Sequence, residues 1–282
     1  MSVKIIVDST ADIAKNIKNE FKIVPLTLRF GEQEYIDGIT ITRQQFYERL
    51  IESDTLPQTS QATPNAFDRV FREVVENGDE AVVLTVASKL SGTYQSAMIA
   101  AEDYDGKIFV VDSKSAAIGT GILAELALQW VREGYSAEKI AEKLMVDREK
   151  ITIVATLDTL EYLKKGGRIS SAAAIAGGIL SIKPVVSLEG GEIKMLGKAR
   201  GSKQGNNLLI QKIEECGGVD FEKPLLLGYT GITDVFLEKY VEDSRHLWDG
   251  SVDHLNKTQI GSVIGTHAGP GAIAVAFFKK NK

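Results

Sequence analysis

Short apolar runs alternate with amphipathic stretches in the first half of the chain. Val3–Val7, Ala81–Val86 and Lys107–Val111 have the β-branched composition of buried parallel strands. Thr63-Pro64 supplies a cap and a first-turn proline to a helix whose apolar residues follow at helical spacing. This alternation of strands and helices predicts an open, mostly parallel α/β sheet with right-handed crossovers.

Two further helices are expected before residue 150. The segment 119–132 is apolar nearly all round, which indicates a deeply buried helix rather than a surface one. Ser136 then caps a helix that carries Ile140 and Leu144 on its apolar side.

The second half has a different pattern. Glu189-Gly190-Gly191 between two apolar runs predicts a β-hairpin, which makes the sheet partly antiparallel. The expected elements are a strand at 151–156, a helix at 158–165 ending at Gly166-Gly167, hairpin strands at 184–188 and 192–196, a helix near 202–215, a strand at 224–229, a helix near 234–246 and two final strands. We therefore expect an N-terminal α/β domain at 1–150 and a C-terminal α+β domain with a mixed or antiparallel sheet at 151–282.

Composition narrows the class of protein. A chain of 282 residues suits two domains, and its single cysteine, Cys216, cannot form an internal disulfide. No apolar run is long enough to cross a bilayer, and the first residues begin a strand without a leader-like pattern. We expect a cytoplasmic protein. A formal net charge of −5 disfavours a general nucleic-acid binder, although lysines and arginines cluster locally around residues 164–168 and 194–203.

The segment 260–271 combines several glycines with one imidazole, His267. Glycines allow tight turns and close backbone approach, and such segments commonly build binding sites. We expect a glycine-rich loop held between two strands, with His267 facing a ligand.

Hydroxyl residues follow three of the expected strands in the first half. Parallel strands end at a common edge, where open α/β sheets bind ligands. Ser91-Gly92 enters a helix, so its hydroxyl and free N–H groups suit a carboxylate or phosphate, although simple capping would also explain Ser91. Capping is the favoured interpretation for Asp8 and Asp112.

Two other segments contain polar residues that helix caps do not explain. Thr63 is accounted for as a cap, but Thr59 and Ser60 in the preceding polar loop are not. After the helix ending at Gly166, a second glycine and Arg168 likewise lack a structural assignment, and a run of very small residues follows at 170–178.

Several common sites are absent from the sequence. There is no P-loop, no nucleophile elbow and no cluster of metal ligands, and the two weak dinucleotide-like patterns are misplaced relative to their expected strands. His246 and His254 are interpreted as surface or structural residues. We expect no cofactor.

Taken together, these segments resemble the DegV family, the fatty-acid-binding proteins that include the FakB-type subunit of bacterial fatty acid kinase. The resemblance runs in family order over nearly the whole chain, and its motifs are specific as a set. The matching segments are Val7-Asp-Ser-Thr-Ala-Asp12, Thr59-Ser-Gln61, Leu90-Ser-Gly-Thr-Tyr-Gln-Ser96, Val111-Asp-Ser113, Leu163-Lys-Lys-Gly-Gly-Arg-Ile-Ser170, Lys183-Pro184, Lys198-Ala-Arg200 and Ile264-Gly-Thr-His-Ala-Gly-Pro-Gly271.

The resemblance implies two α/β domains with a long-chain fatty acid buried between them. It implies that the carboxyl group is held by Thr59 or Ser60, by Ser91 with the Gly92 N–H, and by His267. Arg168 and Arg200 match basic residues near the head group, and we assign Arg200 to presentation. Arg168 either serves the ligand or holds the Gly-Gly loop. The implied partner is a separate ATP-dependent kinase that converts the carboxylate into an acyl phosphate, and transient membrane contact is compatible with this role.

Elementary energetics fits that interpretation. A buried carboxylate needs several converging donors, and a long acyl chain gains on the order of 10 kcal/mol from burial before ordering costs. The tail therefore needs an interior tunnel, for which 122–131 and 172–179 are the expected walls.

Two other functions compete with this binding, non-enzymatic role. One is a Ser/His acyl hydrolase that uses Ser91, His267 and either Asp8 or Asp112. The other is a lipid-sensing transcription regulator, for which the sequence contains no helix-turn-helix pattern.

Overall fold

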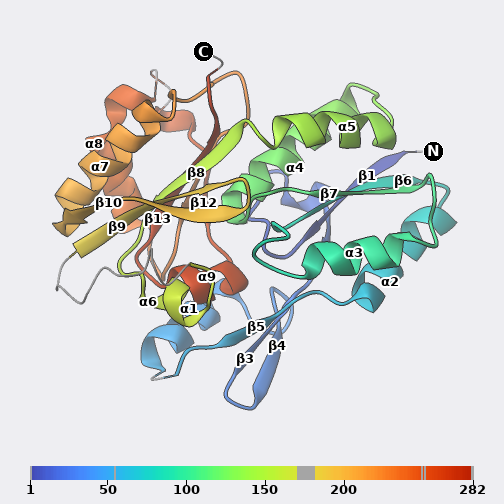
Figure 1. The fold of residues 1–282 in the computed structure, drawn as a ribbon, viewed down its shortest axis with the longest axis horizontal. Coiled ribbons are helices and arrows are strands. Elements are labelled where there is room, and N and C mark those ends of the chain that lie inside the picture. Colours follow the sequence, from blue (N-terminus) through green and yellow to red (C-terminus); the bar gives the residue numbers. More distant parts are fainter. Residues whose placement is uncertain (1, 54, 170–181, 249, 251, 281–282) are drawn as a thin grey trace.

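The fold is described from a computed structural model, which covers residues 2–53, 55–169, 182–248, 250 and 252–280 (Figure 1). The first half contains a four-stranded sheet in the order β2-β1-β6-β7, and every pairing in it is parallel. Its strands are β1 (Val3–Asp8), β2 (Lys22–Val24), β6 (Glu80–Thr85) and β7 (Ile108–Asp112). The predicted parallel sheet is confirmed.

Helices cover both faces of this sheet. On one face lie α2 (Pro64–Glu76) and α3 (Thr93–Ala101), and on the other lie α4 (Ala117–Arg132) and α5 (Ala137–Asp147). The predicted caps form, because the Thr63 and Ser136 side chains accept hydrogen bonds from N–H groups in the first turns of α2 and α5. A short 3₁₀ helix, η1 (Lys18–Glu20), links β1 and β2.

The second half contains a six-stranded mixed sheet in the order β10-β9-β8-β13-β11-β12. Only β11 and β12 pair in parallel among its described strands. The strands are β8 (Ile151–Thr156), β9 (Ile182–Glu189), β10 (Glu192–Arg200), β11 (Leu226–Tyr229), β12 (Lys257–Gln259) and β13 (Ile273–Phe278). The predicted hairpin is β9–β10, and it is longer than expected because pairing continues to Ile182 and Arg200.

Different helices pack on the two faces of this second sheet. Helices α7 (Gly201–Glu215) and α8 (Val235–Asp243) cover the outer face, followed by the 3₁₀ turns η2 (Arg245–Leu247) and η3 (Val252–His254). Helix α4 lies against the inner face and also contacts the first sheet. Since α4 packs between the two sheets, its sequence must be apolar on nearly every side, as the composition of 119–132 predicted.

A small third sheet, in the order β4-β3-β5, was not anticipated. It consists of β3 (Thr27–Phe30), β4 (Gln33–Ile36) and β5 (Gln58–Ser60), with α1 (Arg43–Glu52) inserted between β4 and β5. The strands are only three or four residues long, so periodicity gives little signal for them. Thr59 and Ser60 therefore lie on a strand rather than in a loop.

The glycine-rich segment before β13 differs from the prediction. Ser262–Ala268 forms a helix, α9, instead of a loop between two strands, and Gly269 ends it at φ 71°. Gly265 lies inside this helix, and glycine is needed at this position because a Cβ would be 2.5 Å from the Tyr47 hydroxyl. Close packing of α9 on α1 thus overrides the low helix propensity of glycine.

The remaining differences are smaller. Helix α6 covers only Glu161–Lys165. The run of small residues noted at 170–178 lies outside the described residues. The division into domains at residue 150 stays a prediction, although the two large sheets are drawn from either side of it. Among the described residues, none of the helices has both the length and the apolar composition of a membrane span.

Candidate functional site

A largely apolar cavity lies between the two large sheets and α9. Its volume is about 150 Å³, on the order of ten times what one water molecule requires. Both halves of the chain line it. Apolar side chains from the second half form much of the wall, among them Ile153, Ala155, Leu157, Val186, Leu188 and Ala274.

Polar side chains from separate elements also line this cavity. They include Thr59, Ser60, Gln61, Ser91, Arg168 and His267. Five of these were predicted as site residues, and the structure brings all five to one cavity although they lie in four different stretches of the sequence. An apolar chamber with a small polar group of residues is the usual form of a site for an amphipathic small molecule.

His267 and Thr59 form a direct contact in this polar group. The Thr59 hydroxyl lies 3.0 Å from Nε2 of His267, which joins β5 of the small sheet to α9. The other ring nitrogen, Nδ1, is buried and has no hydrogen-bond partner among the described residues. The imidazole is thus oriented by a hydroxyl, without a carboxylate behind it.

The electrostatic environment keeps His267 neutral at physiological pH. Burial, together with the nearby Arg168 guanidinium, lowers the pKa of His267 from 6.5 to about 4. A neutral imidazole can donate one hydrogen bond to a carboxylate but forms no ion pair with it.

Ser91 lies at the entry of α3, where the sequence placed it. Its Oγ lies 2.9 Å from Oγ1 of Thr93 and accepts a hydrogen bond from the Thr93 N–H at 3.3 Å. Ser91 therefore has the capping contact of the alternative interpretation and also lines the cavity. The capping interpretation is confirmed for Ser91, and its role in binding a carboxyl group stays a prediction.

Gly92 is the N-cap residue of α3 but does not itself line the cavity within the described structure. A Cβ at this position would be 2.1 Å from Oε1 of Gln61. Gln61 in turn donates a hydrogen bond to the Ser96 hydroxyl at 2.9 Å. Gly92 thus makes room for Gln61, a cavity residue that sequence reasoning noted only as part of the Thr59-Ser-Gln61 motif.

Arg168 connects the two halves of the chain at the cavity. Its Nε donates to the Leu90 carbonyl oxygen at 3.2 Å, and its Nη1 donates to the Gly166 carbonyl oxygen at 2.5 Å. The second contact is the one expected if Arg168 holds the Gly-Gly loop, while its place in the cavity wall is the one expected for a ligand residue.

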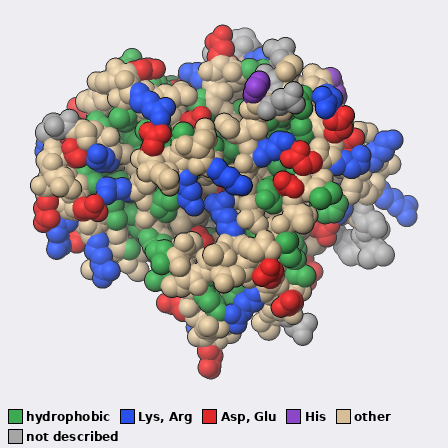
Figure 2. Space-filling model, turned by 180° about the vertical axis from the view of Figure 1, so that it is seen from behind, with side chains coloured by type: hydrophobic (Ala, Val, Ile, Leu, Met, Phe, Trp, Pro, Cys, Tyr) green, Lys and Arg blue, Asp and Glu red, His purple; other side chains and the backbone are tan. Residues whose placement is uncertain are grey.

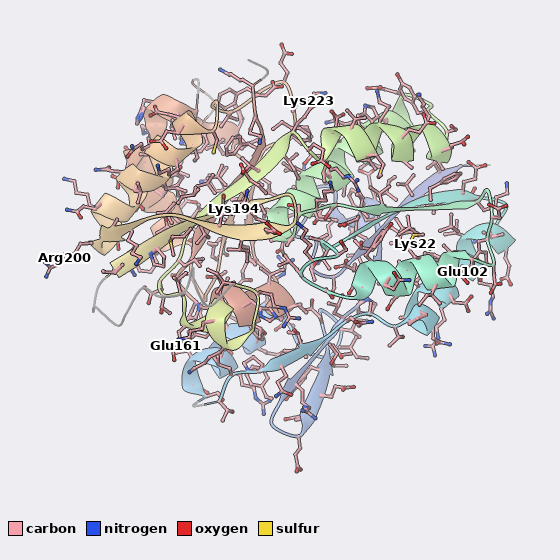
Figure 3. All side chains as sticks on the ribbon, viewed as in Figure 1. Lys22, Glu102, Glu161, Lys194, Arg200 and Lys223 are labelled. Carbon is pink, nitrogen blue, oxygen red and sulfur yellow. The ribbon has the colours of Figure 1, made fainter. Side chains whose placement is uncertain are left out.

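Arg200 lies elsewhere. It is exposed at the end of β10, where it pairs with Ile182, and it is not among the described residues that line the cavity (Figure 3). The β9–β10 hairpin places Arg200 at the edge of the molecule, outside the cavity wall, and its role in presentation stays a prediction.

The acidic residues Asp8 and Asp112 have structural partners, as the capping interpretation predicted. Asp8 accepts hydrogen bonds from the Thr10 N–H and hydroxyl and from the Val86 N–H. Asp112 accepts from the N–H and hydroxyl of Ser88. Both carboxylates organise the loops at the ends of the parallel strands.

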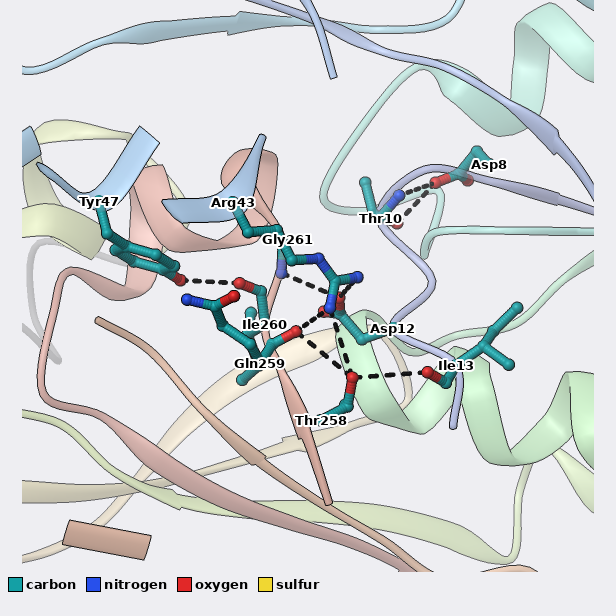
Figure 4. Close-up of polar contacts among 10 residues, drawn as sticks. All are labelled: Asp8, Thr10, Asp12, Ile13, Arg43, Tyr47, Thr258, Gln259, Ile260 and Gly261. Carbon is teal, nitrogen blue, oxygen red and sulfur yellow. Dashed lines mark hydrogen bonds and ion pairs between the residues drawn. The ribbon is translucent and has the colours of Figure 1, made fainter. Parts of the chain in front are cut away.

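A buried charged network beneath the site was not predicted (Figure 4). Oδ1 of Asp12 accepts from Nη2 of Arg43 at 2.7 Å and from the Gly261 N–H at 2.9 Å, just before α9. Arg43 also donates to Thr258 and to the Gln259 carbonyl oxygen. Asp12 belongs to the first motif of the sequence, but nothing in the sequence indicated its partner 31 residues away. The network fixes the start of α9 and hence the position of His267.

Burial dominates the titration of this network. It raises the pKa of Asp12 to about 6 despite the favourable charge of Arg43 and the Gly261 hydrogen bond. Burial also raises the pKa of the nearby Asp37. Acidic groups here are destabilised in their charged form at neutral pH, which is the usual cost of burying carboxylates.

The expected tunnel walls need correction. The residues of α4 that line the cavity are Ile118 and its predecessor Ala117 at the start of the helix, rather than 122–131. Gly121 explains the difference. A Cβ there would be 2.1 Å from the Asp12 carbonyl oxygen, so this part of α4 packs directly on the backbone at Asp12 and leaves no space for the cavity. The other predicted wall, 172–179, lies outside the described residues.

On the face seen in Figure 2, positive and negative side chains are interspersed among the described residues. His246 and His254 are exposed, as predicted. The described residues contain no group of three or more side chains that could hold a metal ion.

Comparisons with known proteins agree with this architecture. Residues 2–280 match the family model described as "Uncharacterised protein, DegV family". A DegV domain-containing protein from Caldanaerobacter subterraneus subsp. tengcongensis is 35% identical over 282 residues, covering 99% of each chain.

Two solved structures are similar over nearly the full length. A fatty-acid-binding DegV family protein from Thermus thermophilus is 30% identical with a TM-score of 0.87, covering 99% of this chain and 100% of the other. A stearic-acid-binding protein from Eubacterium ventriosum is 30% identical with a TM-score of 0.83, covering 99% of each chain. With the family model matched over almost all of its residues, the chain belongs to the DegV family.

Proposed function

We propose that this protein binds one long-chain fatty acid in the cavity between its sheets, with the carboxyl group at Thr59, Ser91 and His267. One observation carries the proposal: hydroxyl and imidazole groups from β5, the α3 entry and α9 converge on a cavity whose remaining wall is mostly apolar. A fatty acid has the same division into a polar end and an apolar tail. The fatty-acid binding of the Thermus thermophilus and Eubacterium ventriosum proteins supports this ligand class.

The neutral state of His267 suits a carboxylate held by hydrogen bonds. A hydroxyl can donate to one carboxylate oxygen while the imidazole N–H donates to the other. Each such donor to a charged acceptor contributes about 1.5–3 kcal/mol. Burial of the acyl chain supplies most of the remaining affinity.

The protein then presents the carboxyl group to a separate ATP-dependent fatty acid kinase in the cytoplasm. The motifs shared with FakB-type proteins support this role, as does the sequence's lack of a P-loop. Arg200, exposed at the end of β10, is the residue assigned to this presentation. Conversion of a carboxylate to an acyl phosphate adds negative charge, which favours a cation on the docking face.

The hydrolase alternative lacks a triad in the described structure. Ser91 contacts Thr93, and His267 contacts Thr59. Among the described residues, no hydrogen bond joins the serine to the imidazole. Nδ1 of His267 has no carboxylate partner, while Asp8 and Asp112 are engaged by other groups. A pKa near 4 also makes His267 a weak base at neutral pH.

The functional test measures two activities of the purified protein. Incubation with a fatty acid kinase, ATP and fatty acid should produce an acyl phosphate only when this protein is present. Incubation with a chromogenic acyl ester should give no turnover above that of a His267→Ala variant. The proposal would be wrong, and the hydrolase function right, if ester turnover depends on both Ser91 and His267 and the protein does not promote acyl-phosphate formation by the kinase.

A further inference from the structure

A second, smaller cavity lies on the opposite face of the six-stranded sheet from the fatty acid cavity. Its volume is about 40 Å³, enough for a few water-sized groups. Successive residues of a strand point to opposite faces, so Ala155 lines the first cavity and Thr156 lines the second. The polar side chains around this second cavity are Thr156, Lys183, Ser202, Asn206 and Lys239.

The first turn of α7 forms one side of this cavity. The Arg200 side chain at the N-cap makes no capping hydrogen bond, and the first turn contains no acidic residue. The Gln204 side chain accepts a hydrogen bond from the Arg200 N–H at 3.1 Å, which leaves the N–H groups inside the first turn to the cavity. The N–H groups of this turn lack intrahelical acceptors, and the helix dipole places partial positive charge there. At 15 residues, α7 is long enough for this dipole to develop.

Thr156 supplies an independent indication of a ligand. Its side chain is only 6% exposed, and its Oγ1 has no hydrogen-bond partner among the described residues. A buried hydroxyl without a partner costs about 1–3 kcal/mol, so an acceptor is expected beside it. Gly205 allows α7 to lie close to this side chain, because a Cβ on residue 205 would be only 3.3 Å from Cγ2 of Thr156.

The charged side chains facing this cavity can also contribute. Lys183 forms an ion pair with Asp158, and Nζ of Lys239 lies 3.2 Å from Oδ1 of Asp243. Each ammonium group has three donors, so one carboxylate partner leaves donors for a further acceptor. Nδ2 of Asn206 donates a hydrogen bond to Oδ2 of Asp243 at 3.3 Å.

From these features we propose that the second cavity binds a phosphate-type oxyanion. The N–H groups at the start of α7, the Thr156 hydroxyl and the ammonium groups of Lys183 and Lys239 would surround it. Backbone donors at a helix start combined with lysines are the usual chemistry of phosphate sites. The site is separate from the carboxylate site, since the sheet lies between them.

The test is titration of the full-length protein with inorganic phosphate in an isothermal calorimeter. Wild-type protein should bind one equivalent saturably. Ser202→Asp should abolish binding, because its carboxylate occupies the start of the helix, and should not lower thermal stability, because acidic residues favour helix N-termini. Thr156→Val should weaken binding by about tenfold or more, the effect of losing one donor to a charged acceptor.

Thr85→Val is the matched control, because Thr85 is another buried threonine whose hydroxyl lacks a partner in the described structure, and it lines neither cavity. It should leave phosphate binding unchanged, and all three variants should keep the wild-type fatty acid content. A parallel titration with glycerol 3-phosphate identifies the source: equal affinity indicates the phosphoryl group of a larger molecule, and binding of inorganic phosphate alone indicates the free anion. Absence of saturable phosphate binding to the wild type, or its survival in Ser202→Asp, would overturn the proposal.

Discussion

Gly166 and His267 lie so close together that a Cβ on residue 166 would be 2.2 Å from Nδ1 of the imidazole. Gly166 has an ordinary helical conformation (φ −75°), so the backbone does not require glycine there. The requirement comes from the imidazole. The glycine that ends α6 therefore has a second role, which is to leave room for the residue that faces the cavity.

The first prediction tests that role. Gly166→Ala should move His267 and weaken fatty acid binding by about tenfold or more, since a displaced donor to a carboxylate costs about 1.5–3 kcal/mol. Gly167→Ala is the control: Gly167 has φ 69° with open space around it, so alanine should lower stability without touching the imidazole. Fatty acid affinity and melting temperature of both variants separate the two effects. Equal affinities in the two variants would contradict the steric account.

Ser91→Ala should weaken fatty acid binding by about 1–3 kcal/mol through loss of one donor. Loss of its contact with the Thr93 N–H should lower stability only slightly. Ser88→Ala, which removes a hydroxyl that contacts Asp112 instead of the cavity, is the matched control. Unchanged affinity in Ser91→Ala at normal stability would mean that Ser91 serves only as a cap.

Arg200→Ala should leave fatty acid content nearly unchanged and impair acyl-phosphate formation by a partner kinase. Lys194→Ala, on the same exposed strand, controls for a general loss of positive charge (Figure 3). Ligand content and acyl-phosphate formation are measured on each variant. If Arg200→Ala loses both to the same degree, the residue supports the fold or the cavity, and the proposed division of labour is wrong.

The stability of the ligand-free protein should depend on His267 below neutral pH. The pKa of His267 is about 4 in the folded chain and 6.5 in the unfolded chain, so between these values the unfolded chain binds more protons. The stability contributed by the neutral imidazole is therefore present above pH 6.5 and lost as the pH falls toward 4. Asp12 acts in the opposite direction, because its pKa is raised to about 6 by burial.

Comparison with His267→Gln isolates the histidine from Asp12 and the other acidic groups. Melting temperatures at pH 7, 5.5 and 4.5 should fall more steeply for the wild type than for the variant. A difference in melting temperature between the two proteins that stays constant over this range would show that His267 is not held neutral.

The sequence predicted the large elements well because their signals are local. The buried strands, the capped helices α2 and α5, and the apolar helix α4 each follow from composition and periodicity within one segment. The family motifs also indicated that Thr59, Ser91, Arg168 and His267 belong to one site, and the structure places all four in the wall of the same cavity.

The failures concern contacts between distant segments. Helix α9 was expected as a loop because glycine has low helix propensity, whereas Gly265 is needed for contact with Tyr47 on α1. The Asp12–Arg43 pair and the close approach of Gly121 to the Asp12 backbone likewise depend on tertiary packing. Arg200 lies at the edge of the molecule because the β9–β10 pairing continues as far as Arg200 and Ile182. The length of such a hairpin does not follow from residue types alone.

Mass spectrometry of an organic extract of the purified protein shows whether the cavity holds a fatty acid. The extract is made after denaturation, and its lipid content is compared with that of the Gly166→Ala and Gly167→Ala variants purified in the same way. We expect a long-chain fatty acid near one equivalent in the wild type and in Gly167→Ala, and a lower content in Gly166→Ala. Wild-type protein that yields no fatty acid, and takes none up when incubated with one, would contradict the proposed binding.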